Sequence, residues 1–148
     1  MPERSAAYHL DRRLPATCLL ITPSVQLASS VHGVLTRGIG SRVWIWQEAA
    51  LEPALRVLRA CEFRLILFDL TLADARPGSA LRALRRHAPR TPLALLAAGV
   101  ETPLRLERKG MGDERARLAG AAAVVPQADP AALERAVRRI LGMPPERG

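Results

Sequence analysis

Short apolar runs alternate with amphipathic stretches along most of this chain. Five runs have the length and the aliphatic or aromatic content of β-strands, and they span residues 17–21, 42–47, 65–68, 92–97 and 121–125. The run 65–68 contains no polar residue, which is typical of a strand buried on both faces. After each run, apolar residues return at helical spacing, so the pattern predicts a helix there, the fourth a short one at residues 113–119.

Capping residues predict where two of these helices begin and end. Ser24 is a candidate N-cap for the first helix, and Gly38 is expected to close it. Asp129 and Pro130 form an N-cap and first-turn pair for the last helix, and Gly142 stands at its end.

Five repeats of strand then helix demand right-handed crossovers and a parallel sheet covered on both faces. The fold class is therefore predicted as α/β, a flavodoxin-like doubly wound five-stranded parallel sheet of the (βα)5 type. Residues 1–15 are polar and are expected to form a flexible arm. Residues 16–142 form the expected domain, with an insertion at about 99–112, and residues 143–148 form a tail.

Composition narrows the class of protein further. The net charge of +8 is almost wholly due to arginine, with Lys109 the only lysine, and it is spread over several helices, so we do not expect nucleic acid as the partner. No apolar run has membrane-spanning length and the N-terminus is too polar for a signal peptide, so we expect a cytoplasmic protein. Cys18, Cys61 and the scattered histidines lack metal-ligand spacing, so we expect reduced thiols and no metal site.

The all-apolar run ends in a single acidic residue, Asp69, at the sheet edge where α/β folds place their functional groups. The segment LILFDLTLAD (65–74) resembles the strand-three signature of response-regulator receiver domains, in which this aspartate is the phosphoacceptor. The segment AGAAAVVPQADPAAL (119–133) resembles the fifth strand and last helix of the same family. The resemblance extends over residues 17–142.

The resemblance also shows what this chain lacks. Receivers hold Mg²⁺ with an acidic pair after strand one, and here these positions are Thr22 and Pro23. The hydroxyl residue that ends strand four is replaced by Ala97, and the lysine after strand five falls at or next to Pro126. We therefore expect no Mg²⁺ cofactor, no catalytic residue and no phosphorylation of Asp69, whose charge would be met by solvent or by backbone N–H groups.

Asp74, in the loop after strand three, is a possible second carboxylate, but its position does not match the family's acidic pair.

Two surfaces are candidates for contact with other proteins. The insertion carries Arg105, Arg108 and Lys109, and the last helix carries Arg135, Arg138 and Arg139. In receivers, the face of helix four, strand five and helix five resembles a general docking surface, so we expect a protein partner or a homodimer there. Trp44 and Trp46 share one face of the second strand; we expect them to pack under a helix, with a partner anchor as the alternative.

Three functional hypotheses follow. The first is a non-enzymatic pseudo-receiver that acts in two-component signalling or a phosphorelay by phosphorylation-independent protein–protein interaction. The second is a functional receiver in which Asp69 is phosphorylated in an atypical site. The third is an arginine-rich module that binds nucleic acid or a small ligand.

Overall fold

The computed structural model describes residues 16–72, 77–97, 121–127 and 129–144. Its centre is a five-stranded, all-parallel sheet with the strand order β2-β1-β3-β4-β5. The strands are β1 (Ala16–Ile21), β2 (Val43–Glu48), β3 (Leu65–Asp69), β4 (Leu93–Ala97) and β5 (Ala121–Pro126). This is the doubly wound, flavodoxin-like arrangement that the alternating pattern predicts.

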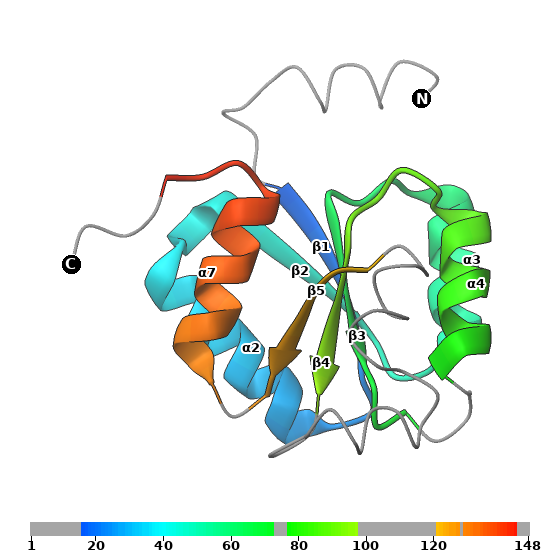
Figure 1. The fold of residues 1–148 in the computed structure, drawn as a ribbon, viewed down its shortest axis with the longest axis horizontal. Helices are drawn as coiled ribbons and strands as arrows, with labels where there is room; N and C mark the ends of the chain where they lie inside the picture. The colour runs from blue at the N-terminus through cyan, green and yellow to red at the C-terminus, as the bar shows by residue number, and fades with distance from the viewer. Residues whose placement is uncertain (1–15, 73–76, 98–120, 128, 145–148) are drawn as a thin grey trace.

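Helices cover both faces of the sheet, as Figure 1 shows. One face carries α2 (Val25–Gly38) and α7 (Pro130–Ile140), and the other carries α3 (Leu51–Ala60) and α4 (Pro77–His87). A short 3-10 helix, η1 (Gly40–Arg42), connects α2 to β2. The predicted insertion and the predicted helix at 113–119 lie outside the described residues.

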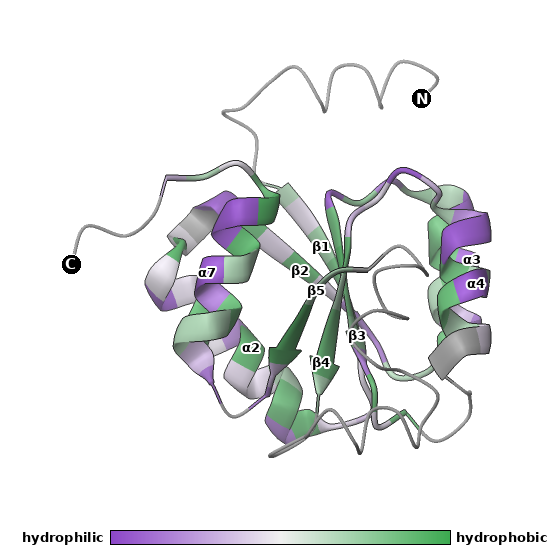
Figure 2. Cartoon of the chain, in the orientation of Figure 1, coloured by the Kyte–Doolittle hydropathy of each residue, from purple (hydrophilic) through white to green (hydrophobic). Residues whose placement is uncertain are grey.

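The central strands are buried because both of their faces are covered. Every residue of β3 and of β4 is buried, which explains why their sequences, LILFD and LALLA, show no alternation. Colouring by hydropathy shows the sheet as an apolar layer between helices whose outer faces are polar (Figure 2). The all-apolar run therefore identifies the middle of the sheet.

The local signals for helix ends are confirmed. The hydroxyl of Ser24 accepts a hydrogen bond from Leu27 N at 3.0 Å, and the carboxylate of Asp129 accepts one from Ala132 N at 3.0 Å. Gly142 has a φ of +72° after α7, a left-handed conformation that glycine adopts without strain. α2 ends at Gly38, as predicted, and the positive φ in the loop after it is at Gly40.

The second strand differs from its prediction. It spans Val43–Glu48, because Arg42 belongs to η1, and it is an edge strand paired only with β1. The prediction that its tryptophans pack under a helix is wrong: Trp44 is 63% exposed and Trp46 is 46% exposed. Val43 and Ile45 are the residues of this strand that pack against the core below α2.

The two cysteines are free thiols on opposite faces of the sheet, as expected without a disulfide. Cys18 packs in the core below α2 and α7, whereas Cys61 packs against the core below α3 and α4. Burial raises the pKa of the Cys18 thiol well above its ordinary value, so this thiol is inert. Within the described ranges, no helix has the length and apolar character needed to cross a membrane.

Candidate functional site

The candidate site lies where the carboxyl ends of the parallel strands meet. Asp69 is the last residue of β3, Thr22 follows β1 directly, Ala97 ends β4, and Gln127 follows β5 directly. Strands β1 and β4 flank β3, so the topology brings together residues that are far apart in the sequence. Asp69 is 1% exposed and Thr22 is fully buried.

Both carboxylate oxygens of Asp69 accept hydrogen bonds from uncharged donors. The hydroxyl of Thr22 donates to Oδ2 at 2.6 Å. Oδ1 accepts from the backbone N–H of Thr71 at 2.8 Å, from the Thr71 hydroxyl at 2.6 Å and from the side-chain amide of Gln127 at 3.1 Å. An ionised carboxylate has about four lone-pair sites. Oδ1 therefore shares its two lone-pair sites among three donors, whereas Oδ2 has one donor among the described residues for its two sites.

Thr22 and Gln127 are themselves held in place by the backbone. The N–H of Ser24 donates to Thr22 Oγ1 at 3.1 Å, which leaves the hydroxyl hydrogen of Thr22 directed at Asp69. The amide nitrogen of Gln127 also donates to the carbonyl of Leu96 at 3.3 Å, so its two hydrogens have two acceptors. The network joins the ends of β1, β3 and β5 and includes the Leu96 carbonyl of β4.

The residues of this site do not fit Mg²⁺. A magnesium ion needs near-octahedral oxygen ligands, commonly one or two free carboxylates and several waters. Oδ1 of Asp69 already accepts three hydrogen bonds and Oδ2 accepts one, and no group of three histidine, cysteine, aspartate or glutamate residues in the described part of the chain could hold a metal ion. Asp74, the possible second carboxylate, lies outside the described residues.

The four positions that depart from the receiver pattern differ in what they contact. Thr22 contacts Asp69 directly, and Ala97 is buried at the end of β4, where its carbonyl accepts from Gln127 N at 2.8 Å. Pro23 and Pro126 are exposed. Of the two positions considered for the lysine, it is the one after Pro126 whose side chain reaches Asp69.

Sequence reasoning missed two of the residues around Asp69. Gln127 lies inside the segment that resembles receivers. Its position immediately after the fifth strand was the feature that could have identified it. Thr71 lies two residues after Asp69, the spacing at which an aspartate side chain binds the backbone in an Asx-turn. The expectation that only backbone groups or solvent meet the Asp69 charge is corrected, because three of the four bonds come from side chains.

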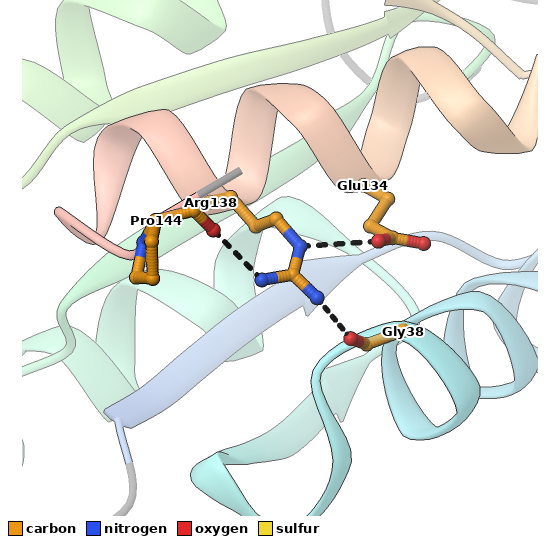
Figure 3. Close-up of polar contacts among 4 residues, drawn as sticks. All are labelled: Gly38, Glu134, Arg138 and Pro144. Atoms are coloured by element: carbon orange, nitrogen blue, oxygen red, sulfur yellow. Dashed lines mark hydrogen bonds and ion pairs between the residues drawn. The ribbon is translucent and has the colours of Figure 1, made fainter. Parts of the chain in front are cut away.

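Among the arginines of α7, Arg138 is used inside the chain (Figure 3). Its Nε binds Glu134 at 3.0 Å, and its two terminal nitrogens donate to the carbonyls of Pro144, at 2.9 Å, and of Gly38. A Cβ at Gly38 would collide with the Glu134 carboxylate, so α2 and α7 approach closely here. Arg138 also lines a hollow beside α7, but its guanidinium is bound within the chain.

The other two arginines of α7 are exposed. Arg135 and Arg139 line the same hollow, of about 670 Å³, and Arg139 makes only a long hydrogen bond of 3.5 Å to the carbonyl of Ala122. The rest of the expected docking face lies outside the described residues. This applies to the helix predicted at 113–119 and to Arg105, Arg108 and Lys109.

Comparison with solved structures identifies the fold as that of response-regulator receiver domains. The chain is similar to a response regulator from Thermotoga maritima (19% identity, 87% of this chain and 99% of that chain, TM-score 0.69). It is also similar to a putative response regulator from Chloroflexus aurantiacus (22% identity, 86% and 98%, TM-score 0.70) and to the chemotaxis response regulator CheY4 of Vibrio cholerae (18% identity, 86% and 99%, TM-score 0.68). No protein-family model matches the sequence, and no curated protein matches it.

Proposed function

We propose that this chain is a pseudo-receiver, a non-enzymatic signalling module that acts by protein–protein contact without phosphorylation. The observation that carries the proposal is the hydrogen-bond network around Asp69, in which every donor is uncharged. In phosphoryl transfer, the charge that develops on the phosphoryl oxygens must be met by a metal ion and a cation. In the described part of the chain, no arginine, lysine or histidine is bonded to Asp69.

The arrangement suits a fixed structural role for this aspartate. The donors hold its carboxylate under the loop that leaves β3, and Leu72 N also donates to the Asp69 carbonyl at 3.1 Å. Phosphoryl transfer to Oδ2 would have to displace the Thr22 hydroxyl, and transfer to Oδ1 would have to displace the donors of Thr71 and Gln127. Either transfer would admit a dianionic group into a buried site. A receiver that no longer switches at this position is left with its surfaces as the means of signalling.

The experiment is exposure of the whole chain to Mg²⁺ with acetyl phosphate or beryllofluoride. We expect no mass gain and no change in the amide spectrum of residues near Asp69. A chemotaxis response regulator treated in the same way is the positive control for the reagents. A phosphoryl adduct on Asp69, lost in Asp69→Ala, would overturn the proposal and establish the chain as an atypical phosphoacceptor.

The partner of the proposed function is an acidic protein surface, since the exposed arginines of α7 line a hollow. The double variant Arg135→Glu/Arg139→Glu should lose proteins that the wild-type chain captures from its source cell. The matched control is Arg82→Glu/Arg86→Glu, which changes the charge by the same amount on α4, on the other face of the sheet, where both side chains are exposed. Equal capture by all three proteins would remove α7 from the proposal.

A further inference from the structure

The outer edge of the sheet at β2 exposes apolar side chains on a strand with one partner. Among the described residues, β2 pairs with β1 alone, in an unbroken parallel register from Val43 to Glu48. Trp44 and Trp46 are, with Val25, the large hydrophobic residues exposed in the described part of the chain. Trp46 is fixed by a hydrogen bond from Nε1 to Glu48 Oε2 at 2.8 Å and by an edge-to-face contact with Phe63.

The hydrogen bonds between β1 and β2 determine which backbone groups of β2 face outward. The carbonyl of Glu48 accepts from Thr22 N at 2.9 Å, so Glu48 faces β1. Backbone groups alternate sides along a strand, so those of Trp44 and Trp46 also face β1, whereas those of Val43, Ile45 and Gln47 face outward.

Natural sheets usually protect such an edge with proline, lysine, a bulge or a very short strand. The sequence of β2, VWIWQE, has neither proline nor lysine among its six residues, and its pairing with β1 has no bulge. At the opposite edge, β5 has a register irregularity against β4 and ends in Pro126. The β2 edge is therefore suited to further strand pairing.

We propose that two copies of this chain pair through their β2 strands, antiparallel, about a two-fold axis at Ile45. In this register Val43 of one copy lies opposite Gln47 of the second copy, and Ile45 lies opposite Ile45. These are the residues with outward backbone groups, so the pairing forms about six new hydrogen bonds. The result is a continuous sheet across both copies.

The same register is complementary in its side chains. Trp44 lies opposite Trp46 of the second copy, at the closer, non-hydrogen-bonded positions where aromatic pairs interact best. Arg42, exposed just before β2, comes within reach of Glu48 of the second copy, and the symmetry repeats this pair. A shift of the register by two residues separates both pairs, so the sequence favours the axis at Ile45.

The pairing uses neither Asp69 nor α7, although β2 bonds Thr22 through Glu48, so the inference goes beyond the proposed function and does not depend on it. A chain that accepts phosphate could still pair at β2, and a pseudo-receiver could still be a monomer.

The experiment is hydrogen exchange combined with sedimentation over a range of concentrations of the full chain. We expect a dimer with a dissociation constant on the order of 10 µM, as for a small interface. The amides of Val43, Ile45 and Gln47 should exchange more slowly as the dimer forms, whereas those of Trp44 and Trp46 should be protected at every concentration. A chain that stays monomeric, or a dimer that leaves the three outward amides unprotected, would overturn the inference.

Two sets of variants test the register. Gln47→Pro removes an outward N–H and leaves the backbone bonds to β1 intact, although it also removes the long bond from Gln47 Nε2 to the carbonyl of Thr22. It should weaken the dimer at least about tenfold. Arg42→Glu and Glu48→Arg should each weaken the dimer, and the double exchange should recover it in part, since opposite charges again face each other. If the double exchange is no better than either single variant, the axis at Ile45 is wrong.

Discussion

The carboxyl end of β3 and the outer edge of β2 differ in how far their polar and apolar groups are buried and bonded. At Asp69 a carboxylate is buried and both of its oxygens accept hydrogen bonds. At β2, two tryptophans are exposed and every second backbone group faces outward. Comparison with receiver domains suggests Asp69 as the functional residue. The exposed tryptophans and the outward backbone groups instead suggest β2 as a binding surface. Binding requires groups that gain new partners by it, and the outward backbone groups of β2 are the basis of the proposed pairing.

The largest expected effect is on stability at Asp69. Asp69→Ala should lower the free energy of unfolding by about 2–4 kcal/mol, because the Thr22 hydroxyl and the Gln127 amide would face a cavity without an acceptor. Asp69→Asn should cost clearly less, since its Oδ1 keeps three donors and its amide can donate to Thr22 Oγ1. Urea denaturation of the three proteins measures the difference. Equal and small losses would mean that the carboxylate is solvated.

A substitution at Thr22 is a second test of the hydrogen-bond network around Asp69. Thr22→Val keeps the shape of the side chain but removes the donor to Asp69 and the acceptor for Ser24 N. The expected loss of unfolding free energy is about 1.5–3 kcal/mol, the range for hydrogen bonds to charged groups. Thr36→Val is the matched control, because Thr36 is exposed on α2 and should stay within about 0.5 kcal/mol. Similar values for the two variants would contradict the network.

The sequence predicted the parts of this fold that depend on neighbours in the chain. The helix caps at Ser24 and Asp129 are local hydrogen bonds, and the buried strand at 65–68 is a local run of apolar residues. The network around Asp69 is not local: its bonds to Thr22 and Gln127 join residues 47 and 58 positions apart. Only the strand order brings these side chains together, and a pattern of single positions does not contain their geometry.

The exposure of the tryptophans could not be predicted for a related reason. Alternation in VWIWQE shows that Trp44 and Trp46 share a face, but not whether a helix reaches that face at the edge of the sheet. The use of Arg138 likewise depends on a close approach of α2 to α7 at Gly38. The same limit applies to any arginine on a helix, since sequence alone does not distinguish a solvated guanidinium from one bound to a distant carbonyl.

The arginines of α7 extend the comparison between used and unused groups. Arg138→Ala should lower the free energy of unfolding by about 1–2 kcal/mol, because it removes the bonds to Gly38 and Pro144. Arg135→Ala should change it by less than about 0.5 kcal/mol, since Arg135 is exposed on the same helix and the change in helix propensity is the same. The difference in stability between the two variants is measured by thermal unfolding. Equal effects would mean that the contacts of Arg138 within the chain do not stabilise the fold and that its guanidinium is available to a partner.

The smallest effect is expected at the open edge. Trp44→Thr keeps the strand propensity of β2 and removes a ring that is 63% exposed, so the unfolding free energy of the monomer should change by less than about 0.5 kcal/mol. Trp46→Thr should cost about 1 kcal/mol, because it also loses the contacts with Phe63 and Glu48. Both are measured at concentrations too low for pairing. A loss above about 2 kcal/mol for Trp44→Thr would mean that this ring is part of the core, and the contrast with Asp69 would disappear.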